Sequence, residues 1–174
     1  SLAEDSDLRK YKQGMAFLLT TRGIPQIYYG TEILMTGTKE GGDGGIRKDF
    51  PGGWEEDSVN AFTAEGRTPR QNEAWNYLQK LLQWRKNNPA VTGGRLVHYA
   101  PNNNGCYVYA RIKDDKTCLV ILNGSDQDHL LAMDRYREVT TPFTRGVEVT
   151  SGEVLDLTGS LNVPARGVYV MDLQ

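Results

Sequence analysis

The chain has 174 residues, of which 39% are hydrophobic and 24% charged, a composition that is typical of a globular protein and excludes a disordered or fibrous one. A formal net charge of −2 gives no electrostatic basis for binding nucleic acid or an anionic membrane. No apolar run approaches the roughly 20 residues that cross a bilayer, so we expect neither a nucleic-acid partner nor a membrane partner. Because the chain begins at Ser1 and shows no signal-peptide pattern, we expect that it was processed or cut from a longer protein.

The first predicted element is a helix over residues 7–22, for which Ser6 or Asp7 supplies a capping side chain. Its apolar positions recur at helical spacing, with Lys and Arg between them. These positions are Leu8, Tyr11, Met15, Leu18 and Leu19. Gly23 suits the left-handed conformation that ends many helices, and Pro25 prevents the helix from continuing.

A short strand and a long loop follow this helix. The apolar run over residues 26–29 predicts a strand that ends at Gly30. The loop from Gly30 to about Pro69 is too long to be a passive connector, and its aromatic residues argue against disorder. We therefore expect a functional loop.

The second half of the chain begins with a helix and then changes character. Residues 70–88 predict a helix with Thr68 as N-cap and Pro69 in the first turn. Its apolar surface is wide enough for the helix to pack on two sides. After Pro89 the pattern alternates, which is typical of an antiparallel Greek-key sandwich or a small barrel of six to eight strands. The predicted strands are 95–100, 106–112, 117–123, 129–133, 146–149, 154–157 and 168–173. The predicted fold class is α+β, divided into residues 1–90 and an all-β domain over 91–174.

The two cysteines lie in a predicted hairpin that turns at residues 114–115. Pairing around that turn places Cys106 opposite Asn123 and Cys118 opposite Arg111. The thiols would lie roughly 17 Å apart along the ladder and on opposite faces, whereas a disulfide needs Cα atoms within about 7 Å. We expect two free cysteines. They do not decide between a bacterial cytoplasm and a periplasm.

Both faces of this hairpin are largely apolar. On one face Val108 and Ala110 oppose other apolar side chains, and on the other face Tyr107 and Tyr109 do the same. We expect one face to cover the sandwich core and the other to be covered by the helical half of the chain.

Three short motifs resemble one enzyme family. GIPQIYYGTE, residues 23–32, resembles the eighth barrel strand of the α-amylase family of glycoside hydrolases, which commonly read G-x-P-x-x-Y-x-G-x-E there. Asp43 and Arg47 match the family's D-x-x-x-R pair in the loop after that strand. DFPGGW, residues 49–54, is similar to the sequence of this loop in neopullulanases, cyclomaltodextrinases and maltogenic amylases. The strands over 91–174 resemble the sandwich domain that closes such enzymes.

The resemblance implies the last α/β units of a (β/α)₈ barrel followed by the sandwich. Residues 7–22 would be the seventh helix, 26–29 the eighth strand and 70–88 the eighth helix. Active sites of such barrels lie on the loops that follow the strands, so the loop from Gly30 would face an α-glucan oligosaccharide. One strand and two helices cannot close a barrel. We therefore expect the first ninety residues to pair with another copy or to lie against the sandwich with apolar surface exposed.

The resemblance also implies four substrate-binding residues: Tyr28, Asp43, Arg47 and Trp54. A guanidinium held by a carboxylate is suited to orienting sugar hydroxyls, and aromatic faces pack on the apolar side of a glucose ring. The alternative for Asp43 and Arg47 is an ion pair that only stabilises the loop. Tyr28 and Tyr29 alternate along a strand, so at most one of them should face the site.

The residues that would catalyse the reaction are not found in this sequence. The family hydrolyses α-1,4 or α-1,6 glucosidic bonds with retention, using an Asp nucleophile, an acid/base Glu and a third Asp in an N-H-D motif. This chain contains no N-H-D, and retaining hydrolysis needs two carboxyl groups about 5–5.5 Å apart. We expect an enzyme as the parent protein and no catalytic residue here.

The remaining acidic and histidine residues suggest no further site. The run over residues 55–57 is typical of a solvated loop, and the lone His98 and His129 have no metal-ligand spacing. We expect no metal and no cofactor, although the resemblance leaves calcium open in the parent. The alternative function is a non-catalytic carbohydrate-binding or structural β-sandwich module, and transfer or branching remains an alternative to hydrolysis.

Overall fold

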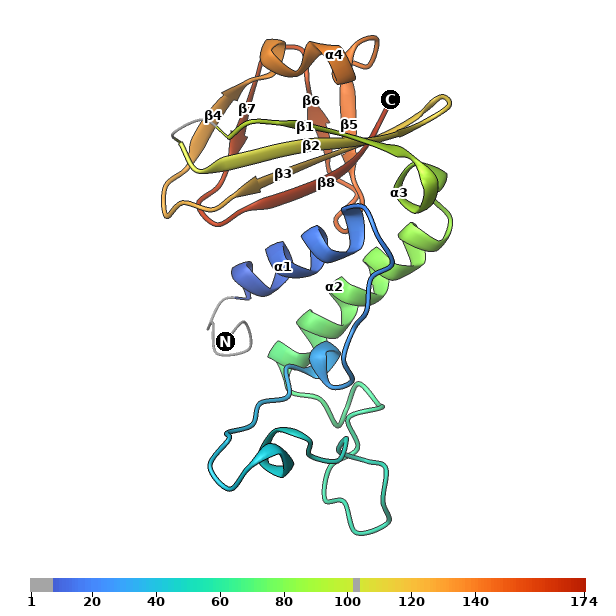
Figure 1. Ribbon diagram of the computed structural model, residues 1–174, viewed down its shortest axis with the longest axis vertical. Coiled ribbons are helices and arrows are strands. Elements are labelled where there is room, and N and C mark those ends of the chain that lie inside the picture. Colours follow the sequence, from blue (N-terminus) through green and yellow to red (C-terminus); the bar gives the residue numbers. More distant parts are fainter. Residues whose placement is uncertain (1–7, 102–103) are drawn as a thin grey trace.

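The computed structural model describes residues 8–101 and 104–174. A β-sandwich occupies one end of the molecule, two long helices lie beneath it, and an irregular loop extends from the far end of the helices (Figure 1). The long helices are α1, Arg9–Thr20, and α2, Pro69–Lys86. None of the helices in these described ranges is long and apolar enough to cross a membrane.

Helix α1 confirms the helix predicted over residues 7–22. The predicted caps Ser6 and Asp7 lie outside the described residues. Gly23 is not the residue that stops the helix: α1 ends at Thr20, Thr21 is already extended, and Gly23 lies two residues farther on at a positive φ of 119°.

The strand predicted over residues 26–29 is wrong for this chain. The segment 24–28 has no regular structure, and no described segment pairs with it. A strand is defined by hydrogen bonds to a neighbouring strand, so an apolar segment without such a neighbour does not form one. The next element is instead the 3₁₀ turn η2, Thr31–Ile33.

The predicted long loop is present and runs from this turn to α2, broken only by a second 3₁₀ turn, η3, Asp43–Ile46. Its last part is anchored by Arg67, which donates to the carbonyls of Ala61 and Phe62 at 2.9 and 3.1 Å. The Arg67 guanidinium also lies 4.1 Å from the centre of the Trp75 ring on α2, a stabilising cation–π contact. The loop therefore enters the helix in a fixed position.

Helix α2 begins with the predicted cap. Thr68 Oγ1 accepts from the Gln71 amide at 3.2 Å, and Gln71 Oε1 accepts from the Thr68 amide at 2.9 Å. This reciprocal capping box satisfies two of the amides that every helix start leaves free. Pro69 occupies the first turn, where a missing N–H costs nothing.

The all-β part contains eight strands and three short helical pieces. The strands are β1 Arg95–Tyr99, β2 Cys106–Lys113, β3 Lys116–Asn123, β4 His129–Ala132, β5 Arg145–Glu148, β6 Val154–Asp156, β7 Ser160–Val163 and β8 Val168–Leu173. The helical pieces are α3 Pro89–Gly93, η4 Met133–Tyr136 and α4 Arg137–Thr140. All seven predicted strands are confirmed. Strand β7 was not predicted, although its residues alternate between exposed and buried, because it has only four residues and follows closely on a turn.

The strands form a six-stranded sheet in the order β1-β2-β3-β8-β5-β6 and a two-stranded sheet of β4 and β7. All pairs are antiparallel. The connections from β3 to β4, from β4 to β5, from β6 to β7 and from β7 to β8 pass between the two sheets. This confirms the predicted sandwich, in which strands distant in sequence become neighbours.

The register of the central hairpin is the predicted one. Cys106 pairs with Asn123 and Cys118 with Arg111, and both thiols are free and buried. Burial raises the pKa of Cys106, and it raises that of Cys118 well above its ordinary value.

We expect neither thiol of the native protein to react at pH 8 with a disulfide reagent that releases a coloured thiolate. The reactive species is the thiolate, and here both thiols are buried and their pKa values raised. In urea that unfolds the chain, both thiols should react within minutes. Stoichiometric labelling of the folded protein would contradict the buried positions.

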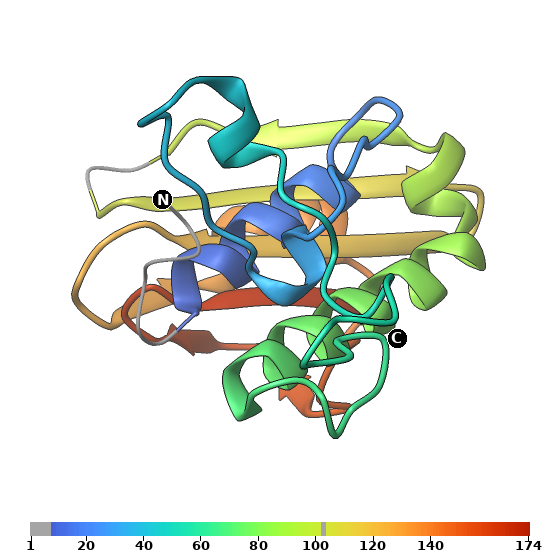
Figure 2. The ribbon, with the colours of Figure 1, turned by 90° about the horizontal axis from the view of Figure 1, so that it is seen from below.

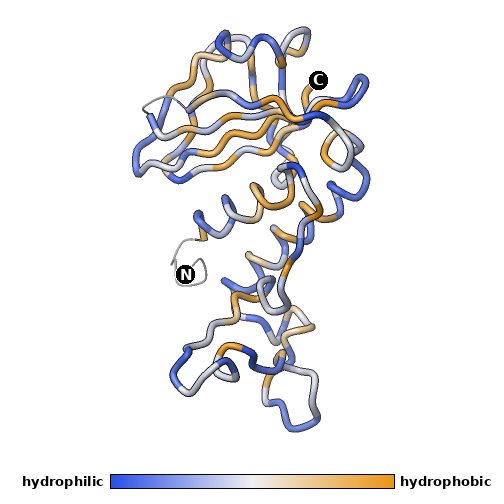
Figure 3. Tube along the Cα trace, in the orientation of Figure 1, coloured by the Kyte–Doolittle hydropathy of each residue, from blue (hydrophilic) through white to orange (hydrophobic). Residues whose placement is uncertain are grey.

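The two faces of the large sheet close two separate cores, as the apolar pattern on both faces of the hairpin predicts. On one side Val108, Ala110 and Leu119 pack against the small sheet and η4. On the other side Tyr109 and Val120 pack against the long helices. Figure 2 shows α1 lying along the sheet with the strands behind it, and Figure 3 shows hydrophobic residues concentrated where sheet and helices meet.

The end of α1 is held by a buried arginine from the sheet. Arg111 Nη1 donates to the carbonyls of Thr20 and Thr21 at 2.8 Å each, and Nη2 donates to that of Gly94 at 2.9 Å. Arg85 from α2 donates to the carbonyl of Leu19 beside them. Two guanidinium groups therefore occupy the end of the helix where free carbonyls and the helix dipole favour positive charge.

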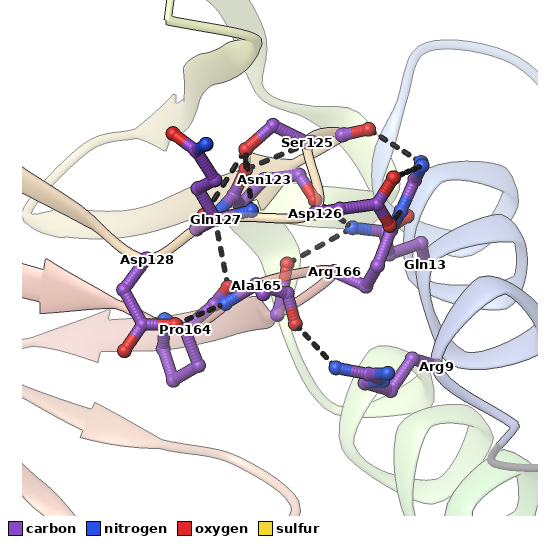
Figure 4. A network of polar contacts seen from close by, with 12 residues as sticks. Arg9, Gln13, Asn123, Ser125, Asp126, Gln127, Asp128, Pro164, Ala165 and Arg166 are labelled. Atoms are coloured by element: carbon purple, nitrogen blue, oxygen red, sulfur yellow. Dashed lines mark hydrogen bonds and ion pairs between the residues drawn. The ribbon is translucent and has the colours of Figure 1, made fainter.

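The start of α1 is held by the loops of the sandwich (Figure 4). Gln13 Nε2 donates to the carbonyls of Asn123 and Gly167 at 2.6 and 3.0 Å, and Arg9 donates to that of Ala165 at 3.0 Å. Polar contacts thus fix both ends of α1, and apolar contacts fix its middle. The helical part lies against the sandwich and leaves apolar side chains exposed, among them Ile24 and Phe17; the predicted pairing with another copy stays a prediction.

Candidate functional site

The candidate site lies at the loop end of the molecule and is built around two adjacent tyrosines. The rings of Tyr28 and Tyr29 have centroids 4.7 Å apart at an interplanar angle of 42°. The two residues are 59% and 43% exposed and line the same cavities. The prediction that at most one of them faces the site is therefore wrong. Side chains alternate only along a paired strand, and this segment has no pairing partner among the described residues.

Tyr29 joins the tyrosine pair to the loop that carries the charged motif. Its hydroxyl donates to the Lys48 carbonyl at 2.8 Å. Desolvation raises the pKa of Tyr29, and the nearby charge of Arg47 lowers it.

The predicted pair Asp43 and Arg47 is formed, by a single contact. Arg47 Nη2 lies 3.4 Å from Asp43 Oδ2, and both side chains are more than half exposed. The contact closes the turn η3 at i,i+4 spacing, where an exposed ion pair adds little stability. Most donors of the guanidinium remain directed to solvent, which suits either the sugar-binding role or the loop-bracing role predicted for this pair.

A cavity of about 280 Å³ lies between the tyrosines and these turns. It is lined by Tyr28, Tyr29, Gly30, Thr31, Met35, Thr36, Gly37 and Ile46. Two glycines are needed for its shape: a Cβ on Gly30 would lie 2.4 Å from Met35 Sδ, and one on Gly37 would lie 2.3 Å from the Gly45 carbonyl oxygen. The motif glycine Gly30, at a φ of 82°, thus permits both the turn and the close approach.

An apolar groove of about 440 Å³ lies on the other side of the tyrosines, between them and α2. It is lined by Ile27, Tyr28, Tyr29, Glu32, Trp75, Leu78, Gln79, Leu82 and Gln83. Its floor is the face of α2 turned away from the sheet, as expected for a helix that is apolar on two sides. The sequence motif did not reveal this groove, because its residues come from segments about fifty positions apart.

Trp54 lies apart from the tyrosine cavity. It is 64% exposed and lines neither of the two cavities beside the tyrosines. Its turn is fixed by Asp57, whose Oδ2 accepts from the amides of Gly52 and Trp54 at 2.7 and 3.1 Å. Residues 55–57 are exposed, which confirms the predicted solvated loop, and Asp57 in addition shapes the turn that presents the indole.

The chemistry available at this site is recognition of a ligand. It offers aromatic surface, a solvent-facing guanidinium, backbone carbonyls and hydroxyl groups, which suit a neutral polar ligand with an apolar face. Within residues 8–101 and 104–174, no group of three or more His, Cys, Asp or Glu is arranged to hold a metal ion. Of the two histidines, His129 has a structural contact, 2.8 Å from Nε2 to Ser125 Oγ.

Known proteins resemble this chain over most of its length. Residues 96–172 match the family described as the cyclo-malto-dextrinase C-terminal domain. A maltogenic α-amylase of Bacillus acidopullulyticus is 34% identical over 122 residues, covering 68% of this chain and 18% of that protein. A cyclomaltodextrin glucanotransferase of Geobacillus stearothermophilus is 34% identical over 128 residues, covering 74% of this chain and 15% of that protein. The chain thus spans less than a fifth of the length of these relatives.

The likeness to solved structures extends over the helices and the loop as well as the sandwich. An α-amylase from Geobacillus thermoleovorans, solved with acarbose, superposes with a TM-score of 0.69 at 23% identity, covering 95% of this chain and 33% of that one. A γ-cyclodextrin glucanotransferase from alkalophilic Bacillus clarkii gives a TM-score of 0.69 at 28% identity, covering 97% and 24%. The chain belongs to the α-amylase family, and its residues 96–172 form a cyclo-malto-dextrinase C-terminal domain.

Proposed function

We propose that this chain is the C-terminal part of a retaining, neopullulanase-like enzyme that hydrolyses α-1,4 or α-1,6 bonds of α-glucans. In this role the loop end supplies one wall of the substrate site, and the sandwich supports it. The observation that carries the proposal is the tyrosine pair held against the Asp43–Arg47 turn by the hydrogen bond from Tyr29 to Lys48. Tyr28, Asp43, Arg47 and Trp54 are the proposed substrate contacts, and the catalytic carboxylates would come from elsewhere in the enzyme.

Each side chain has a role that its chemistry supports. The exposed ring of Tyr28 offers a face for the apolar side of a glucose ring, and the free donors of Arg47 suit sugar hydroxyls. Asp43 holds that guanidinium from one side. Trp54 stands on its own fixed turn and would contact a sugar farther along the chain.

The apolar groove beside the tyrosines is a second feature that supports the proposal. An enzyme several times longer than this chain has further segments that can cover it, as the lengths of the relatives suggest. In the isolated chain the groove is open, and we propose that it is the surface through which two copies would associate. Light scattering over a range of protein concentrations tests this: a mass that stays monomeric throughout contradicts self-association.

The direct test of the proposed function is binding without turnover. The isolated chain should bind maltotriose weakly, with the Trp54 indole N–H signal shifting in NMR titration, and should not hydrolyse pullulan, starch or cyclodextrin. Arg47→Ala should weaken this binding about tenfold, because it removes charge-assisted hydrogen bonds. Arg137→Ala, which removes an equally exposed arginine on the sandwich, is the matched control and should leave binding unchanged.

Two outcomes would contradict the proposal. Hydrolysis by the chain alone would place catalytic groups where we find none. Equal binding by the Arg47→Ala and control variants, or no shift at Trp54, would favour the alternative function, a carbohydrate-binding or structural sandwich module. The family match over residues 96–172 supports that alternative.

A further inference from the structure

A second polar cavity lies at the opposite end of α2 from the loop. It has a volume of about 300 Å³, within the size range of small-ligand sites. We call it the α2-end niche; it is lined by Trp84, Asn87, Asn88, Pro89, Lys116, Thr117, Asp172, Leu173 and Gln174. Helix α2 has 18 residues, so the niche lies about 27 Å along the helix from the loop. It is a separate place on the molecule.

The niche is organised around the carboxylate of Asp172. Trp84 Nε1 donates to Asp172 Oδ2 at 2.7 Å, and Asn88 Nδ2 donates to Oδ1 at 2.8 Å. Asn88 is itself fixed, since its Oδ1 accepts from the amides of Ala90 and Val91. The carboxylate is therefore held in one orientation, and because each of its oxygens has two lone pairs, each retains one for a ligand.

Further polar groups surround this carboxylate without being used by the protein. Lys116 lies at the rim and lowers the pKa of Asp172 by its charge, while burial raises it more strongly. Asn87 donates only to the carbonyl of Gln83, at 3.1 Å, which leaves its own side-chain oxygen available.

The combination of these groups decides the class of ligand. The niche offers acceptors on Asp172 and Asn87, the donor group of Lys116, and the half-buried ring of Trp84. The opposite charges of Asp172 and Lys116 nearly cancel, so the niche has no net attraction for a phosphate or a free cation. Interleaved donors and acceptors beside an aromatic ring match a neutral ring that carries several hydroxyl groups.

We propose that the α2-end niche binds a glucosyl unit of an α-glucan, as a second contact remote from the tyrosine cavity. The choice of glucose as the ring rests on the proposed function, whereas the preference for a neutral polyhydroxyl ligand rests on the niche alone. A weak contact here would raise the local concentration of a long glucan near the loop end.

Tryptophan signals test the niche and the loop site independently. The chain has three tryptophans, and in ¹⁵N-labelled protein the indole N–H of Trp84 reports on the niche while that of Trp54 reports on the loop. Maltotriose should shift the Trp84 signal along a saturating curve. Lys116→Ala should weaken the affinity read at Trp84 about tenfold, the typical effect of one charge-assisted hydrogen bond, and should leave the Trp54 titration unchanged.

The matched control is Lys113→Ala, which removes another exposed lysine directly across the hairpin from Lys116 and outside the niche. Its Trp84 titration should equal that of the unaltered protein. A Trp84 signal that does not move, or moves equally in both lysine variants, would overturn the proposal. A shift with glycine, used as a zwitterionic probe, but not with maltotriose would overturn it too. Movement at Trp84 without movement at Trp54 would support the niche while counting against the proposed function.

Discussion

Replacing Arg111 by methionine is expected to lower the free energy of unfolding by about 3 kcal/mol, because three inward-facing carbonyl oxygens lose their donor at a typical cost of about 1–3 kcal/mol each. Burial lowers the pKa of Arg111, and Arg85 lowers it further, so removing the charge returns part of this loss. Methionine keeps the apolar stem of the side chain and leaves no large cavity. The measurement is urea unfolding followed by tryptophan fluorescence.

The matched control for this prediction is Arg137→Met, which removes an exposed arginine from the short helix α4 and should change stability by less than about 0.5 kcal/mol. Hydrogen exchange gives a second readout. The amides of the last turn of α1 should lose protection in the Arg111→Met protein, since the carbonyls of Thr20 and Thr21 lose their anchor to the sheet. An Arg111→Met protein as stable as the control would show that Arg85 alone holds the helix end.

Replacing Asn123 by aspartate is expected to cost about 3 kcal/mol at neutral pH, although the shape of the side chain is conserved. Asn123 is fully buried, and its Nδ2 donates to the carbonyls of Gln127, Val163 and Pro164 at 2.7, 3.2 and 2.9 Å. A carboxylate cannot donate, so it would face three carbonyl oxygens with like partial charge and without water. The network in Figure 4 would lose its centre.

This effect should depend on pH in a defined direction. Burial among carbonyls raises the pKa of the introduced carboxyl in the folded state above its value in the unfolded chain. The variant is therefore most stable below the unfolded pKa, near 4, and loses stability as the pH rises through the folded pKa. Asn162→Asp, at an exposed position on β7, is the control and should show neither the loss nor this pH dependence. A neutral-pH loss below about 1 kcal/mol would contradict the role of the three hydrogen bonds that Asn123 Nδ2 donates.

The hairpin shows how much of the fold the sequence predicts. Its register follows from a short turn and a side-chain period of two, both of which are local properties. From them came the pairing of Cys106 with Asn123, the free thiols, and two apolar faces that close two cores. The capping box at Thr68 is equally local, since four consecutive residues make it.

The tyrosine segment shows where sequence reasoning fails. Residues 26–29 have the composition of a strand, but a strand also needs neighbours that supply hydrogen bonds, and composition cannot supply them. Because no described segment pairs with these residues, Tyr28 and Tyr29 turn to the same side instead of alternating. Strand β7 shows the reverse case: its alternation covers only four residues, too few to predict a strand, and its pairing with β4 defines it.

The sequence by itself determined which segments are helices, which hairpin carries both cores, and which motifs place the chain in the α-amylase family. These features depend on spacing and turns within a few residues. Only the tertiary structure decided which side chains meet across long separations: Arg111 at the end of α1, Asn123 beside the end of β7, and Asp172 between Trp84 and Asn88. Each of these polar groups is buried or half-buried and must find its partner wherever the fold brings one, and no local pattern records where that will be.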